Sequence, residues 1–440
     1  MAANATAALS ADVERVVLSS PAPPWLAGLR RHAAERFRAT GFPNRRQEAW
    51  RFTPIAPVAE TEFTLRRGDG DVDHALLDHL AFAESHRLVF VDGRLAPALS
   101  SVGDLPAGVL AGSLAEALAT RPGLLEPHLG RLARPELTPF AALNAAAFTD
   151  GAIVVLPRDA VLERPLHLLF LATGADAPWA SLPRTLLVAG ENSAATVVET
   201  YAGTAGDTIL AAPVTEIVLE AGARLRHVRE QREGPGAYHL GTLAIRQGRD
   251  SSITSHTLSL GARLARLDLV DVLAGEGASA TLNGLYMVDG DQHAGVNMTV
   301  EHAAPSCTSH ELYKGVVDGR GSAAFNGLIH VYPDAQQTNA KQSNRNLLLS
   351  RQALANSNPQ LRILANDVKC THGSTVGQLD EDAVFYLRSR GLDRAAARAL
   401  LTYAFAAEIV EGITVDAVRH ELTDLLYGRL PRRGVALEGA

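Results

Sequence analysis

The feature that most constrains this chain is a recurrence of short alternating segments across residues 150–377. Each segment alternates apolar and polar positions, is rich in β-branched or aliphatic residues, and is followed by glycine, as in LLVAGENSAATVV, IVLEAGARLRHV and VLAGEGASATLNG. Alternation with a period of two indicates β-strands, and repetition of this kind is typical of stacked β-coils. We therefore predict a β-solenoid, although a sandwich or a barrel would satisfy the alternation equally well.

Three regions follow from this pattern. Residues 1–143 are predicted to be mixed and largely helical, with one helix that begins near Pro24 and stops at Gly41. Residues 144–377 form the predicted β-core, in which no long helical pattern interrupts the strands. Residues 378–440 read as a helical C-terminal region.

The C-terminal region carries clear helix signals. Asp380 and Asp393 stand at N-cap positions, and the helix after Asp393 is apolar on nearly all sides, through Leu400, Leu401, Tyr403, Phe405, Ile409 and Val410. A stripe this wide needs cover on more than one side. Either the β-core covers it, or part of it is a docking site for another protein.

Composition excludes several classes of function. The chain has 440 residues, of which 47% are apolar, and its net charge of -7 is spread without a basic block, so we expect no nucleic acid partner. The N-terminus lacks the charged and apolar segments of a signal peptide, and no apolar run is long enough to cross a bilayer. We therefore expect a cytoplasmic protein without a membrane partner.

The lysines exclude one nucleotide-binding motif. Lysine occurs only at positions 314, 341 and 369, and none of the three follows a glycine. The chain therefore lacks the G-x-x-x-x-G-K-[ST] phosphate loop. If ATP drives its work, we expect another subunit to hydrolyse it.

The two cysteines suggest metal chemistry. Cys370 is followed two residues later by His372, and the segment LRILANDVKC is predicted to be the last strand of the core, so both side chains would share one face. A closed zinc site or an iron-sulfur cluster usually needs four ligands. Cys307 could contribute if it folds close by, but its neighbours His302 and His310 are spaced too loosely for a metal motif, and a hydrogen-bonding role for each histidine stays open.

Several longer motifs favour a metal-related role for the Cys-x-His pair. The segments NRNLLLS (344–350), NPQLRILANDVKCTHGSTVG (358–377) and LDEDAVFYLRSRGL (379–392) strongly resemble the SufB/SufD family of iron-sulfur cluster assembly proteins. The Cys-x-His form of the second segment is similar to the SufD branch of that family. The segments GFPNRRQEAWRFTPI, PFAALNAAAFTDGAIV and HAAPSCTSHELYKGVVDGRGSAAFNGLIHV agree with it in order, and residues 1–20 carry none of it.

The resemblance implies a fold and partners. Members of this family have a right-handed parallel β-helix core flanked by N-terminal and C-terminal helical domains. It implies that the chain pairs through its β-helix edge with SufB, that the C-terminal helical domain docks the ATPase SufC, and that a homodimer is an option without SufB. ATP would then act only through SufC.

The resemblance also implies a role for the Cys-x-His pair. Cys370 and His372 would form half of a metal site at the SufB boundary, with the remaining ligands from SufB. The cargo would be iron or a nascent iron-sulfur cluster, not held tightly by the isolated chain, and the chain itself would be non-catalytic. Whether Cys370 is a ligand, and what Cys307 does, stay open at this point.

Two other functions fit the sequence less well. A polysaccharide-cleaving β-helix would need acids and arginines clustered on neighbouring coils and a route of secretion, whereas the acids here are scattered. A SufB-type scaffold that carries the cluster alone is disfavoured because the C-terminal motif holds only one cysteine.

Overall fold

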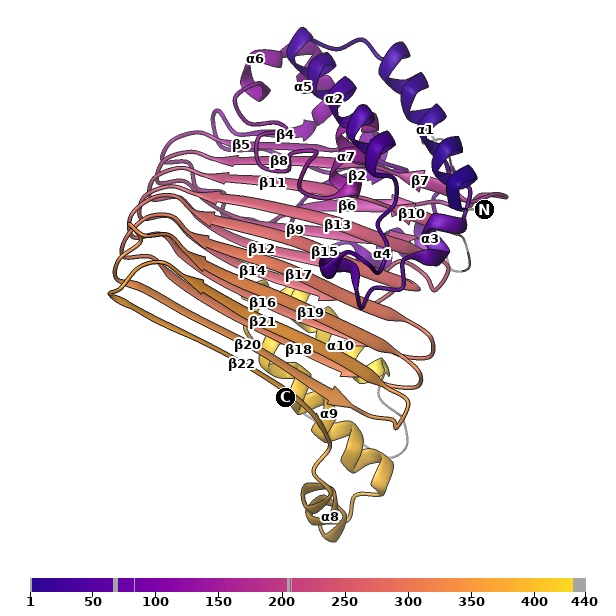
Figure 1. The fold of residues 1–440 in the computed structure, drawn as a ribbon, viewed down its shortest axis with the longest axis vertical. Helices are drawn as coiled ribbons and strands as arrows, with labels where there is room; N and C mark the ends of the chain where they lie inside the picture. Colours follow the sequence, from indigo (N-terminus) through magenta and orange to yellow (C-terminus); the bar gives the residue numbers. More distant parts are fainter. Residues whose placement is uncertain (1, 66–69, 83, 204–205, 207, 430–440) are drawn as a thin grey trace.

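The computed structural model describes residues 2–65, 70–82, 84–203, 206 and 208–429. Its core is a parallel β-solenoid in which successive strands alternate between two facing sheets (Figure 1). The predicted solenoid is therefore confirmed, and the sandwich and the barrel are excluded. The last predicted residues of the C-terminal region, 430–440, lie outside the described part.

Each coil contributes one strand to each sheet. The 12-stranded sheet contains β21 (Leu354–Ile363), β19 (Ser322–Val331), β17 (His293–His302), β15 (Leu264–Leu273), β13 (Tyr238–Gln247), β11 (Val214–Leu219), β8 (Arg184–Ala189), β5 (Ala152–Leu156) and β4 (Leu110–Ser113) in that order, with β1 (Thr64–Leu65), β7 (Trp179–Ser181) and β10 (Ile209–Ala211) beside this path. The 10-stranded sheet contains β22 (Val368–Gln378), β20 (Thr338–Leu348), β18 (Thr308–Val317), β16 (Ser279–Val288), β14 (Ser252–Ser259), β12 (Arg224–Gln231), β9 (Ala194–Gly203), β6 (Leu166–Ala172), β2 (His86–Val91) and β3 (Arg94–Leu95) in that order.

The N-terminal helices lie over the first coils (Figure 1). They are α1 (Ala2–Ser19), α2 (Pro24–Thr40), α3 (Ala56–Glu60), α4 (His74–Leu80), α5 (Leu114–Thr120), α6 (Pro122–Leu125) and α7 (Pro139–Ala147), with two short 3-10 turns, Glu48–Trp50 and Pro97–Leu99. The predicted helix start at Pro24 and stop at Gly41 are confirmed, and Gly41 has a positive φ of 59°.

The N-terminal region and the core are continuous. Helix α7 crosses the predicted boundary between residues 143 and 144, and β2 pairs in parallel with β6, so the first region adds a strand to the 10-stranded sheet. The buried amide of Asn144 also donates hydrogen bonds to the carbonyls of Pro183 (2.9 Å) and Ala212 (3.0 Å). These bonds attach the helix to two coils, which is why no linker separates the regions.

One strand prediction is wrong. The segment LRILANDVKC does not form a single strand, because β21 ends at Ile363 and β22 begins at Val368 in the opposite sheet. Ala365 turns inward at this corner and is buried, and an Asn-Asp pair follows, a combination that favours a turn. The alternation of apolar and polar residues continues through the corner, so the sequence pattern does not reveal that the strand ends there.

The C-terminal helices are α8 (Glu381–Ser389), α9 (Arg394–Val410) and α10 (Asp416–Arg429). The side chains of Asp380 and Asp393 accept hydrogen bonds from the first turns of α8 and α9, as predicted. Helices α9 and α10 pack on the outer side of the 10-stranded sheet, and α8 projects beyond the last coil (Figure 1). The β-core therefore covers much of the wide apolar stripe of α9, including Ile409 and Val410.

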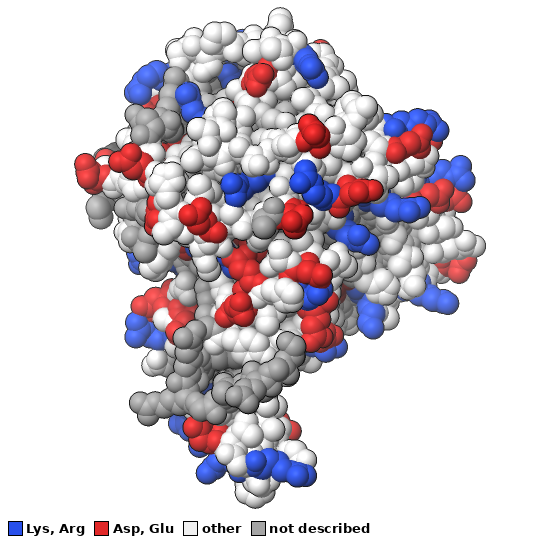
Figure 2. Space-filling model, turned by 180° about the vertical axis from the view of Figure 1, so that it is seen from behind, with Lys and Arg blue, Asp and Glu red and all other residues white. Residues whose placement is uncertain are grey.

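The surface carries charges of both signs. On the face shown in Figure 2, basic and acidic side chains are interspersed and no continuous basic area is visible. Among the described helices, none combines the length and the hydropathy needed to cross a membrane.

Two tyrosines fit inside the solenoid because glycine lies beside each of them in the adjoining coil. Gly284 of β16 pairs with Tyr313 of β18, and Tyr286 of β16 pairs with Gly315 of β18. A Cβ atom at Gly284 would lie 2.1 Å from the ring of Tyr313, and one at Gly315 would lie 2.1 Å from the ring of Tyr286. Both tyrosines are fully buried, so neither ring can move aside easily.

We therefore expect Gly284→Ala to lower the free energy of unfolding by about 1 to 3 kcal/mol, because the added methyl overpacks a rigid core. Urea denaturation would measure the change. Gly373→Ala on β22 is the matched control, since a Cβ there would meet nothing within 4 Å. Equal losses in the two variants would contradict the packing argument.

Candidate functional site

The Cys-x-His pair lies at the open end of the solenoid. Cys370 and His372 are on β22, the terminal strand of the 10-stranded sheet, and β22 pairs along one side only, with β20. Because they are two residues apart on a strand, both side chains lie on the same side of the sheet, as predicted. Cys370 is half-buried, whereas His372 is exposed and its imidazole makes no hydrogen bond to any described residue.

Cys370 faces the interior of the last coil. Its register partner is Ala340 of β20, and it packs against a small apolar cluster that includes Ile329 and Val331. Burial raises the pKa of the Cys370 thiol, and the nearby charge of Glu311 raises it further. The protein alone therefore favours the protonated thiol over the thiolate.

Cys307 does not complete the set. It is buried at the turn between β17 and β18, and its sulfur donates to the carbonyl oxygens of Gly275 (3.3 Å) and Pro305 (3.5 Å). Burial raises the pKa of this thiol as well. Within the described ranges, no three His, Cys, Asp or Glu side chains come together in a way that could hold a metal ion.

The two histidines near Cys307 are not brought to the pair. His302 is buried, its Nε2 shares a hydrogen bond of 2.9 Å with Ser309 Oγ, and burial lowers the pKa of its imidazole to about 4. His310 is exposed on the opposite side of β18 from its neighbour Ser309. For His302, the structure therefore supports the hydrogen-bonding role that the sequence left open.

The register brings two further polar side chains in line with His372. Gln342 of β20 is its partner in the adjoining coil, and Glu311 of β18 is the partner of Gln342. Both are buried, at 1% and 2% exposure. The three residues form a column that runs across β18, β20 and β22. Sequence reasoning missed this column because its members are about thirty residues apart in the chain, and only an alignment of successive coils would have placed them side by side.

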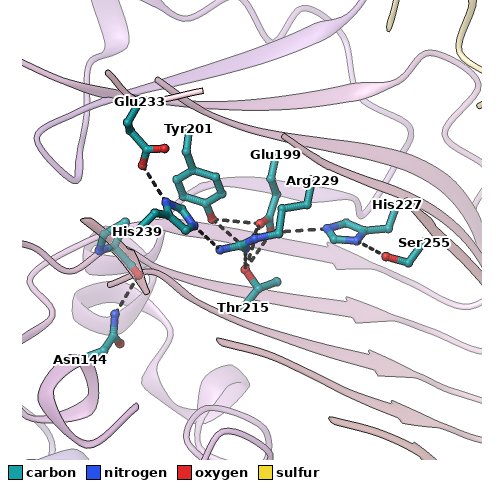
Figure 3. Close-up of polar contacts among 10 residues, drawn as sticks. Asn144, Glu199, Tyr201, Thr215, His227, Arg229, Glu233, His239 and Ser255 are labelled. Atoms are coloured by element: carbon teal, nitrogen blue, oxygen red, sulfur yellow. Dashed lines mark hydrogen bonds and ion pairs between the residues drawn. The ribbon is translucent and has the colours of Figure 1, made fainter. Parts of the chain in front are cut away.

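A separate polar network occupies the middle of the solenoid (Figure 3). Arg229 Nη1 donates to Glu199 Oε2 at 2.7 Å, and Thr215 and Tyr201 donate their hydroxyls to the same carboxylate at 2.9 Å each. Burial alone would raise the pKa of Glu199, but its hydrogen bond with His227 and the charge of Arg229 lower it to about 2.

The same network continues through histidine. Arg229 Nη2 lies 3.3 Å from His239 Nε2, and His239 Nδ1 lies 2.7 Å from Glu233 Oε1 (Figure 3). These charges have partners of opposite sign in a buried setting. We interpret this network as structural because each carboxylate is already occupied by protein donors.

Comparison with known proteins identifies the family. The SufBD core domain of the SUF system for FeS cluster assembly matches residues 170–405, and the SufBD N-terminal region matches residues 11–168. The chain belongs to the SufBD family. It therefore has a role in iron-sulfur cluster assembly, and the family implies SufB- and SufC-type partners.

Individual relatives agree. An iron-sulfur cluster assembly SufBD family protein of Synechocystis is 34% identical over 94% of this chain and 93% of that protein. SufD of Escherichia coli is 30% identical over 89% of this chain and 90% of that protein, and SufD of Bacillus subtilis is 26% identical over 65% of each. The predicted resemblance to SufD is confirmed.

The interior also contains a carboxyl group with a raised pKa. Asp271 of β15 is fully buried, and both of its oxygens accept from Gln247 Nε2, at 3.2 and 3.1 Å. Burial raises the pKa of Asp271 to about 7. An unfolded aspartate has a pKa of about 3.9, so between these values the folded chain holds a proton that the unfolded chain has released. Raising the pH across this window therefore lowers stability.

We expect Asp271→Asn to remove this dependence. The free energy of unfolding of the variant, relative to wild type, should increase as the pH rises from about 4 to about 7 and level off above that. Urea denaturation at a series of pH values would measure it. Asp291→Asn, at an exposed pair with Arg320, is the control and should show no such increase. A difference independent of pH at Asp271 would refute the assignment.

Proposed function

We propose that this chain is a non-catalytic subunit that pairs with a SufB-type protein and contributes Cys370 and His372 to a site where iron-sulfur clusters are assembled. The observation that supports it most directly is the position of both donors on β22, whose outer side pairs with no described strand. Two donors cannot complete a four-ligand set, so the remaining ligands would come from the partner.

The open end of the solenoid supports the pairing. Strands β21 and β22 terminate the two sheets, so each presents unpaired backbone groups on one side. Four large apolar side chains there are exposed: Leu354 by 55%, Ile363 by 38%, Leu364 by 48% and Val376 by 46%. An end of this kind favours addition of strands from another chain. A homodimer could use the same end when the partner is absent.

The chemistry of the pair suits a temporary cargo. An imidazole and a thiol bind iron well, but the raised pKa of Cys370 means that metal binding must displace a proton. A cluster held by mixed ligands on two chains can be released when the chains move apart. The iron or nascent cluster is thus substrate at this site, and the isolated chain would hold it weakly.

The first prediction from this proposal concerns His372. In the complex with its SufB- and SufC-type partners, His372→Ala should leave assembly and melting temperature nearly unchanged, because the imidazole is exposed and makes no hydrogen bond to described residues. Bound iron and sulfide should fall sharply, because a direct ligand is lost. Subunit stoichiometry, thermal melting and iron and sulfide content would be measured together.

Thr371→Ala, on the opposite side of the same strand, is the matched control. Normal iron content with a lowered melting temperature in His372→Ala would instead indicate a structural histidine, whose loss costs about 1 to 3 kcal/mol when a buried partner is left unsatisfied. Cys370→Ala in the same assay shows whether the thiol is also a ligand.

We propose that a SufC-type ATPase docks on α8. Phe385 is 71% exposed and Tyr386 is 56% exposed, and α8 projects away from the core (Figure 1). Helices α9 and α10 are a weaker choice, because their apolar sides already cover the 10-stranded sheet. Since the chain has no phosphate loop, ATP would act only through this partner.

We expect Phe385→Ser to weaken capture of the ATPase by at least tenfold without lowering the chain's own stability, because an exposed aromatic residue is a typical interface anchor. Titration of labelled ATPase would measure the affinity. Leu18→Ser on α1, at a position 87% exposed, is the control. Removing residues 378–440 is a poorer test, since it would also uncover the outer side of the sheet.

A further inference from the structure

The end of the solenoid contains buried polar atoms without partners. Neither amide atom of Gln342 makes a hydrogen bond to a described residue, and the carboxyl group of Glu311 has only the hydroxyl of Ser309, on its own strand, beside it. Leaving a buried polar group without a partner is unfavourable, and burying an unpaired charge is more so. Burial accordingly raises the pKa of Glu311 to about 8. A bound ligand would give these buried polar atoms the partners that the protein does not supply.

These atoms line up with the proposed cluster site. In-register parallel pairing puts Gln342 beside His372 and Glu311 beside Gln342, in coils about 4.8 Å apart. The charge of Glu311 reaches far enough to raise the pKa of the Cys370 thiol. The column therefore runs from the exposed His372 to the buried Glu311. It ends at the apolar side chain of Leu282 in the next coil.

The electrostatics of the column select a cation. Asp271 from the facing sheet adds a second carboxyl group whose charge raises the pKa of Glu311 further. The basic residues of β18, β20 and β22 stand at the alternate positions, which point to the other side of the sheet; they are Lys314, Lys341, Arg345 and Lys369. Once these two carboxyl groups release their protons, an anionic sulfur species would be repelled here, whereas a divalent metal ion would be attracted.

We propose that Glu311 and Gln342 form an inner binding position for ferrous iron, behind Cys370 and His372. The choice of iron rests on the proposed function, and the donor types agree with it, because carboxylate and amide oxygens bind hard or borderline divalent ions. Water would have to complete the coordination, because no three His, Cys, Asp or Glu side chains converge in the described part of the chain. Such a position binds weakly and suits iron that is passed on to the interface.

Gly327 of β19 provides the space that the side chain of Gln342 occupies. A Cβ atom there would lie 2.6 Å from both Nε2 and Oε1 of Gln342, so any side chain would displace the amide. Its φ is not in the left-handed region, so backbone conformation does not require glycine. The absence of a side chain at Gly327 is what makes room for the amide of Gln342.

The test measures binding of Fe²⁺ alone to the purified full-length chain, by anaerobic equilibrium dialysis at pH 8. Glu311→Gln should weaken binding on the order of tenfold or more, as expected for a lost metal-binding group. Its melting temperature should not fall, because the amide keeps the shape and removes a buried acid. Gly327→Ala should weaken binding without changing any ligand. Glu301→Gln, which removes a partly buried carboxylate of β17 that accepts from Tyr332, is the matched control.

The outcomes separate this inference from the proposed function. The inner position is overturned if Glu311→Gln binds Fe²⁺ as tightly as the wild-type chain. It is also overturned if the wild-type chain binds no Fe²⁺. If His372→Ala loses cluster in the complex while Glu311→Gln binds Fe²⁺ normally, the interface site stands and the inner position fails. If Glu311→Gln loses Fe²⁺ while His372→Ala assembles clusters normally, the inner position stands and the interface site fails.

Discussion

The in-register parallel pairing of successive coils is the constraint on which the rest of this structure depends. From β14 to β22, each strand of the 10-stranded sheet pairs residue by residue with the next, so one side chain sets the surroundings of those above and below it. A slip of one residue would exchange inside for outside along a whole strand. The same register that places glycine beside tyrosine also aligns His372 with Gln342 and Glu311.

Local patterns were enough to predict the strands, the helix caps at Asp380 and Asp393, and the shared face of Cys370 and His372. Those features depend on residues two to four apart. The corner after Ile363 and the Gln342-Glu311 column depend on contacts between coils, which short-range alternation does not report. The roles proposed for Cys370 and His372 rest on family resemblance, because two donors by themselves do not define a metal site.

The solenoid interior treats its charges in two different ways. In the middle, Glu199 is surrounded by donors and has a lowered pKa. Towards the open end, Glu311 forms no ion pair with a described residue, and burial raises its pKa. Both carboxylates are almost fully buried in the same solenoid, so burial alone does not explain the contrast. The difference is that an adjoining coil places the basic groups of Arg229 and His227 beside Glu199.

The packing of α9 and α10 on the outer side of the 10-stranded sheet also bears on how the chain is made. Coils can stack as they leave the ribosome, since each needs only the one before it. The outer apolar side chains of the early strands, such as Val198 and Val228, must wait for Ile409 and Leu422, some two hundred residues later. During that interval a half-made solenoid presents an uncovered apolar wall, and its synthesis is the stage at which this protein is most exposed to aggregation.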